Sequence, residues 1–164
     1  MRASVIFSGF LLFGALCVGT PVMALQSGGV EIGDLETGSV TGQAFKALDV
    51  DLAFTAMEIG GKNVWFPPTA ILSLVAGGTG GRAGRPVLLQ VTNKLASDYT
   101  FHLSADSAMA GPTSLNTTLI LKPGETKYIG IPTSDLTYIT ANNLLIYSNP
   151  TDKGGLSGQL LVLR

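Results

Sequence analysis

The sequence predicts an all-β fold, a β-sandwich of Greek-key type. From Phe45 onward apolar and polar residues alternate with a period of two, which is the pattern of half-buried strands. About eight short runs of this kind follow one another at a spacing of roughly 8–12 residues, and Gly and Pro residues separate them. No stretch has a convincing helical period, although residues 134–140 could hold one helical turn.

The chain begins with a segment that is typical of a secretory signal peptide. Arg2 supplies a positive charge, residues 5–18 are apolar, and Val22 and Ala24 are the small residues that a signal peptidase reads. We expect cleavage after Ala24, so that residues 1–24 are absent from the mature protein. The apolar run is short for a membrane span and contains several glycines. The mature protein is therefore expected to be periplasmic or secreted, without a direct membrane span.

The composition of the remaining chain fits one charge-poor domain. The only Cys is Cys17, inside the predicted signal, so the mature chain has neither a disulfide nor a thiolate metal ligand. Apart from Arg2, nine Lys and Arg residues stand against eleven Asp and Glu residues, and neither sign is clustered. A nucleic-acid partner would require a basic face, so the sequence argues against one.

Two regions are expected within the mature chain. Residues 25–44 are rich in Gly and Ser and have little periodicity, which predicts a loose N-terminal segment with at most one early strand near residues 29–32. Residues 45–164 carry the strand pattern and form the predicted sandwich domain.

The first predicted strand covers residues 49–59, where Val50, Leu52 and Phe54 would share one face. Residues 60–63 form a turn, and residues 64–68 are extended because Pro drives its predecessor into β conformation. Pro123 and Gly124 fit the centre of a type II turn, which requires a positive φ at its third residue. The other strands are predicted at residues 70–75, 86–93, 99–103, 117–121, 126–131, 144–148 and 158–163.

Four short motifs follow one another between residues 50 and 162. They are Trp65-Phe66-Pro67, Val91-Thr92-Asn93, the turn at Pro123-Gly124-Glu125-Thr126, and the ending Tyr147-Ser148-Asn149-Pro150-Thr151 with Gly155-Leu156-Ser157-Gly158. In this order they resemble the cupredoxins, the small blue-copper domains. The resemblance implies a cupredoxin-like β-sandwich over most of the mature chain.

The resemblance also implies where the copper ligands of the family would lie. Ser148 stands at the position of the family's Cys, Thr151 at its second His and Leu156 at its axial Met. For the first His there are two candidates, Tyr99 and His102. Strand alternation sends Tyr99 to the same face as the core residue Phe101 and His102 to the opposite face, which favours Tyr99.

The residues at these positions predict a domain without a metal cofactor. A blue-copper centre needs two imidazoles and a thiolate, and a Ser hydroxyl does not ionise at neutral pH. The loop would then be structural, because its glycines permit tight turns and Leu156 keeps the apolar volume of a Met. The alternative is a copper-binding electron carrier or copper chaperone with an atypical site built from His102, Tyr99, Met57 and Met109.

The sequence indicates a structural or protein-binding role rather than an enzyme. His102 alone does not indicate catalysis, because the sequence spacing places no nucleophile or orienting group beside it. A protein partner is expected, and from the family's usual company we infer an accessory subunit of an extracytoplasmic redox or membrane complex. Trp65, Arg82 and Arg85 are the candidate partner-binding residues. The two arginines lie in the Gly-rich stretch 76–86, which opens no helix and so is not read as a phosphate loop.

Overall fold

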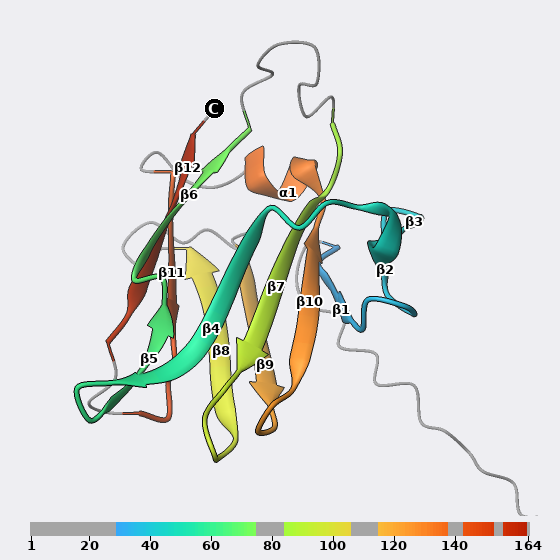
Figure 1. The fold of residues 1–164 in the computed structure, drawn as a ribbon. Coiled ribbons are helices and arrows are strands. Elements are labelled where there is room, and N and C mark those ends of the chain that lie inside the picture. The colour runs from blue at the N-terminus through green and yellow to red at the C-terminus, as the bar shows by residue number, and fades with distance from the viewer. Residues whose placement is uncertain (1–28, 75–83, 106–114, 138–142, 153–155, 164) are drawn as a thin grey trace, which may run out of the picture.

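Two five-stranded sheets pack face to face in the computed structural model, which describes residues 29–74, 84–105, 115–137, 143–152 and 156–163 (Figure 1). The all-β sandwich that the sequence predicts is confirmed. The first sheet has the strand order β1 (Glu31–Gly33), β10 (Thr126–Ile131), β7 (Val87–Asn93), β4 (Leu52–Ile59) and β5 (Lys62–Phe66). The second has the order β6 (Thr69–Ser73), β12 (Gly158–Leu163), β11 (Leu144–Ser148), β8 (Tyr99–Ala105) and β9 (Asn116–Leu121).

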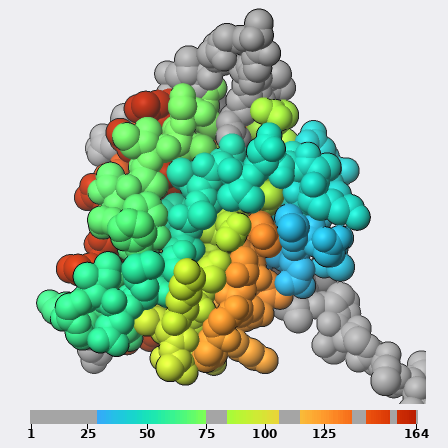
Figure 2. Space-filling view, viewed as in Figure 1, coloured from blue at the N-terminus to red at the C-terminus, as the bar shows by residue number. Residues whose placement is uncertain are grey.

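Most neighbouring strands are antiparallel, but each sheet contains one parallel pair. β4 runs parallel to β7 in the first sheet, and β6 runs parallel to β12 in the second. The chain changes sheet between β5 and β6, where the peptide bond between Phe66 and Pro67 is cis. β4, β7 and β10 lie side by side over one face of the molecule, with β1 beside β10 (Figure 2).

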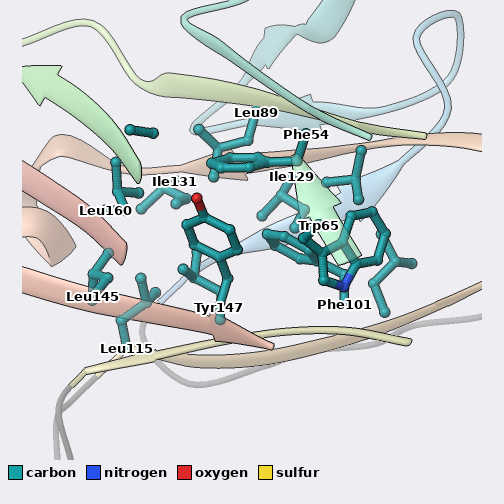
Figure 3. Packing of buried hydrophobic residues seen from close by; sticks show 14 of the residues in the cluster. Phe54, Trp65, Leu89, Phe101, Leu115, Ile129, Ile131, Leu145, Tyr147 and Leu160 are labelled. Atoms are coloured by element: carbon teal, nitrogen blue, oxygen red, sulfur yellow. The ribbon is translucent and has the colours of Figure 1, made fainter. Parts of the chain in front are cut away.

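The core between the sheets is built around aromatic side chains. Phe54, Trp65, Phe101 and Tyr147 point toward one another (Figure 3), with ring centroids 4.7 Å apart for Phe54 and Tyr147 and 4.9 Å apart for Trp65 and Phe101. Burying a large apolar side chain stabilises a fold by about 1.5–3 kcal/mol. Aliphatic residues of both sheets surround the rings, so the core is continuous along the sandwich.

Residues 29–44, the described part of the segment that was expected to be loose, are attached to the first sheet. β1 pairs with β10, and a short ribbon follows, formed by β2 (Ser39–Val40) and β3 (Gln43–Ala44) with a 3-10 turn at Phe45–Ala47. Val40 and Phe45 are fully buried against Leu88. Leu88 faces outward from β7, so the segment is held because it shields this apolar side chain from water.

The strands predicted from residue 49 onward are all present, with small differences at their ends. Val50 was expected on the inner face of the first strand, but β4 begins only at Leu52 and Val50 is exposed. The reason is Asp51, whose carboxylate accepts a hydrogen bond of 2.9 Å from the backbone N–H of Leu88 before regular pairing begins. The turn at Pro123-Gly124 is confirmed by a φ of 76° at Gly124.

The single α-helix of the described residues is α1 (Thr133–Thr137), which overlaps the region 134–140 where one helical turn was predicted. Within the described ranges, no helix combines the length and the apolar character needed to cross a membrane. The predicted signal peptide lies outside the described residues.

Candidate functional site

One end of the sandwich brings together the start of β8, the loop after β11 and strand β5. Tyr99, the first residue of β8, is only 5% exposed. Its hydroxyl donates to the backbone oxygen of Asn63, 3.1 Å away, and lies 3.4 Å from Oδ2 of Asp152. The candidate first-ligand position is therefore occupied by a buried phenol whose hydroxyl already has two protein acceptors.

The loop after β11 is folded around the side chain of Asn149. Oδ1 of Asn149 accepts hydrogen bonds from the backbone N–H of Thr151, at 3.1 Å, and from its hydroxyl, at 2.7 Å. The backbone N–H of Asp152 donates to the carbonyl of Asn149 at 3.2 Å. Such an Asx turn is favoured by Asn followed by Pro, and here it brings Asp152 to Tyr99.

The electrostatics of this end keep the Tyr99 phenol protonated. Burial raises the pKa of Tyr99, and the negative charge of Asp152 raises it further. A hydrogen bond with the side chain of Asn149 lowers the pKa, but by less than either of these effects. The phenol therefore acts as a neutral hydrogen-bond donor rather than as an anionic ligand.

Ser148 and His102 lie together, but away from Tyr99. In β11 the side chains of Tyr147 and Leu145 are buried and Ser148 faces outward. Ser148 is the cross-strand partner of His102, whose Nδ1 lies 2.9 Å from the hydroxyl oxygen of Thr118. These residues share the outer face of the second sheet, while Tyr99 lies on its inner face.

The other predicted positions are also separated. Thr151 is exposed and is held by Asn149, and Leu156 is 60% exposed beside Val64. Met57 faces outward from the first sheet and His102 outward from the second, so the structure does not bring together the atypical copper set. Met109, the fourth member of that set, lies outside the described residues.

The residues at this end do not fit a blue-copper centre. Its trigonal ligand set is two imidazoles and a thiolate. The side chains that converge are instead a neutral phenol, a carboxamide and one carboxylate, those of Tyr99, Asn149 and Asp152. Nowhere in the described part of the chain do three His, Cys, Asp or Glu side chains gather as a metal-binding group.

Tyr147 holds strand β11 in place, just before the loop around Asn149. Its hydroxyl donates to the backbone oxygen of Pro67, and its ring stacks on Phe101 with centroids 5.8 Å apart. The cross-strand partner of Tyr147 is Gly158, where an added Cβ would meet the tyrosine ring at 2.0 Å. The glycine of the C-terminal motif is thus required by a close approach rather than by a metal.

Asn93 fixes the neighbouring loops and is fully buried. Its Nδ2 donates to the carbonyls of Ser97, at 2.8 Å, and Leu121, at 3.0 Å, and its Oδ1 accepts from the N–H of Leu95 at 2.9 Å. The backbone of Asn93 also exchanges hydrogen bonds with the turn that contains Gly124. The second and third sequence motifs therefore meet in space.

An apolar groove of about 220 Å³ adjoins the Tyr99 end along β5. Phe66 is 47% exposed, and Ile59 and Leu156 are more exposed still. None of the lining residues carries a charge. The lining consists of Ile59, Val64, Trp65, Phe66, Pro68, Leu156 and Ser157.

The predicted partner-binding residues have different surroundings. Trp65 is almost fully buried and its indole N–H donates to the carbonyl of Thr100 at 3.1 Å, so Phe66, not Trp65, offers an aromatic surface to a partner. Arg85 is exposed and lies 3.8 Å from the carboxylate of Asp49. Arg82 lies outside the described residues.

Asn149, Asp152 and Phe66 are the site residues that sequence reasoning missed. Strand alternation counted from Tyr147 would have placed Asn149 inward, and the sequence Asn-Pro-Thr is a signal for an Asx turn. No comparable signal distinguishes Phe66 from Trp65, since adjacent aromatic residues in a strand face opposite sides.

No family model matches the chain, and no curated protein matches it. Similar solved structures include auracyanin B, which is 14% identical over 82% of this chain and 99% of its own, with a TM-score of 0.47. An oxidized mutant of amicyanin is 11% identical over 70% of this chain and 84% of its own, with a TM-score of 0.43. A purple cupredoxin from Nitrosopumilus maritimus is 11% identical over 68% of this chain and 99% of its own, also with a TM-score of 0.43. The solved structures that this chain resembles thus include cupredoxins, as its motifs predict, and the likeness concerns the fold alone.

Proposed function

We propose that this protein is an exported, metal-free domain of cupredoxin-like fold with a structural or protein-binding role. It serves as an accessory subunit of an extracytoplasmic redox or membrane complex, and it has no catalytic activity of its own. Export is inferred from the signal-like segment at residues 1–24.

The apolar groove beside Phe66 carries this proposal. Three large apolar side chains, Ile59, Phe66 and Leu156, are about half exposed or more and line the same groove. Clustered exposed apolar side chains of this kind mark interaction sites more often than scattered ones do. Because no charged residue lines the groove, it suits an apolar segment of a protein partner rather than a charged one.

The hydrogen bonds at the end of the sandwich where Tyr99 and Asn149 lie, beside the groove, support the same role. The hydroxyl of Tyr99 and the amide of Asn149 are engaged in hydrogen bonds within the protein. These contacts fix residues 149–152, and a separate backbone bridge between Leu156 and Val64 attaches Leu156 to β5. A rigid apolar surface loses little conformational entropy when a partner binds it.

Metal analysis tests the metal-free part of the proposal. The mature protein, secreted from cells grown with copper and purified without chelators, is expected to contain far less than one copper per chain and to lack an intense visible absorption band. Stoichiometric copper with such a band would contradict the proposal and would favour the electron-carrier alternative.

Affinity capture from native membranes tests the partner-binding part. The bait is the mature protein, compared with a Phe66→Ser, Leu156→Ser variant that removes the two projecting side chains. The matched control is Ile120→Ser, which removes an equally exposed apolar side chain from β9 on the other side of the fold. The proposal requires a partner that is retained by wild type and by the control and lost by the groove variant. Equal capture by all three proteins would refute the role of the groove.

A further inference from the structure

The two edge strands of the second sheet carry no charge, unlike those of the first sheet. Native proteins protect sheet edges with charged residues, Pro or bulges, because an edge offers unpaired backbone N–H and C=O groups. In the first sheet the edge strands β1 and β5 contain Glu31 and Lys62. In the second sheet β6, with the sequence Thr-Ala-Ile-Leu-Ser, has neither a charge nor a Pro.

The backbone groups on the free side of β6 can be assigned from its pairing with β12. The carbonyl of Pro68 accepts from the N–H of Gln159, and the N–H of Leu74 donates to the carbonyl of Leu163, so both point toward β12. Backbone groups alternate along a strand. Those of Thr69, Ile71 and Ser73 therefore point away from β12, toward the side of β6 on which the described residues form no further strand.

The side chains beside this edge form an apolar surface. Ile71 is 57% exposed and is the cross-strand partner of Leu161, which in turn is the partner of Leu144 on β11. Leu163 lies exposed two residues further along β12. No Asp, Glu, Lys or Arg occurs in any strand of the second sheet.

We propose that β6 pairs antiparallel with β6 of a second copy of this chain, which joins the two second sheets into one continuous sheet. The register is centred on Ile71, so that Ile71 faces its own copy and Thr69 faces Ser73. This register uses the backbone groups that point to the free edge. It places two β-branched side chains opposite each other at the centre, and a hydroxyl opposite a hydroxyl at each end.

A second copy fits this edge for two reasons. An antiparallel pair of identical strands is its own partner under a two-fold axis, so the same patch serves both copies. A strand without charges also meets no like charge when it pairs with itself, whereas β1 or β5 would bring Glu31 or Lys62 close to its own copy. No residue of β6 lines the groove of the proposed function, although Pro68 of the groove directly precedes β6, and different substitutions test the two proposals.

Sedimentation of the mature protein over a range of concentrations tests the dimer. Wild type is expected to change from monomer to dimer as concentration rises. Ile71→Lys places two like charges opposite each other and weakens dimerisation at least about tenfold. Ile71→Pro removes the N–H that the dimer uses and is compatible with folding, because that N–H points out from an edge strand. The matched control Ile120→Lys introduces the same charge at an exposed position of the opposite edge and leaves the dimer intact.

Cross-linking gives a second test, which does not depend on whether the Lys and Pro variants fold. In the proposed register the two Ile71 Cα atoms are about 5.5 Å apart, which is within the range of a disulfide. Ile71→Cys is expected to form a disulfide-linked dimer on mild oxidation, since the mature chain has no other Cys, and Ile120→Cys is not. A wild-type protein that stays monomeric at every concentration would overturn the proposal. So would a dimer that Ile120→Lys dissociates and Ile71→Lys does not, or equal cross-linking of the two Cys variants.

Discussion

The ring of Tyr147 lies where a side chain at Gly158 would begin. An ideal Cβ on Gly158 would be 2.0 Å from Cε2 of the tyrosine, and the two residues are direct cross-strand partners in β11 and β12. Tyr147 cannot move aside easily, because it stacks on Phe101 and its hydroxyl is bonded to the carbonyl of Pro67. A structural contact thus explains the final glycine of a motif that resembles a metal-binding loop.

Gly158→Ala is therefore predicted to destabilise the protein by about 3 kcal/mol or more, since overpacking forces the ring and the backbone apart. The free energy of unfolding from urea titration measures the loss. Ser157→Ala, one residue earlier and exposed, is the control and should change stability by less than about 0.5 kcal/mol. Replacing Tyr147 by Leu should reduce the cost of Gly158→Ala, and an unchanged cost would show that the ring is not the obstacle.

Asn93→Ala is predicted to cost about 3 kcal/mol of unfolding free energy. The substitution leaves the carbonyls of Ser97 and Leu121 and the N–H of Leu95 without their present partner, and an unsatisfied buried group costs about 1–3 kcal/mol. Urea titration again measures the effect, and the exposed Gln159→Ala on β12 serves as control. A loss below about 1 kcal/mol would mean that water replaces these hydrogen bonds.

Stability is predicted to fall at alkaline pH because of Tyr147. Burial raises the pKa of Tyr147 from its ordinary value of 10.0 to about 12. The unfolded chain therefore releases this proton at lower pH than the folded one, so the stabilisation is complete below pH 10 and is lost as the pH rises toward 12. Tyr99, whose pKa is also raised, acts in the same direction.

The measurement is the unfolding free energy of wild type and Tyr147→Phe between neutral pH and pH 12. The variant loses the hydrogen bond to Pro67, so it is less stable at neutral pH, but its curve should fall less steeply above pH 10. A difference between the two proteins that stays constant over the whole range would contradict the shifted pKa.

The fold could be predicted because the alternation of apolar and polar residues within each strand identifies that strand from its own sequence. Period-two alternation in residues such as those of β4 and β8 requires no knowledge of distant partners. The N-terminal segment could not be predicted in this way. Its place depends on Leu88, an outward-facing residue in the apolar run of β7, and only the assembled sheet shows that this side chain needs a cover.

The candidate site was predicted only in part, because a sequence motif does not specify which face a residue occupies. Matching Ser148 to the family's Cys followed from the spacing of the loop. In the structure the inward residues are Tyr147 and Asn149, on either side of Ser148. Tyr99 was placed on the inner face by strand alternation, and its burial agrees with that reasoning.

Installing copper ligands at the residues that converge is predicted to create a metal site. The variant Tyr99→His, Asn149→Cys, Asp152→His puts two imidazoles and a thiolate where the present side chains meet, and this is the ligand set that Cu(II) prefers in such centres.

The matched control Tyr99→His, Ser148→Cys, Thr151→His carries the same ligand types at the positions that the sequence motif suggests. In the control the thiolate lies on the outer face, so it cannot share a metal with residue 99, and His102→Ala is added to remove the imidazole beside it. Copper content and visible absorption distinguish the two variants. One bound copper with an intense thiolate band is expected in the first variant only, and a band in the control alone would show that Ser148, not Asn149, faces the site.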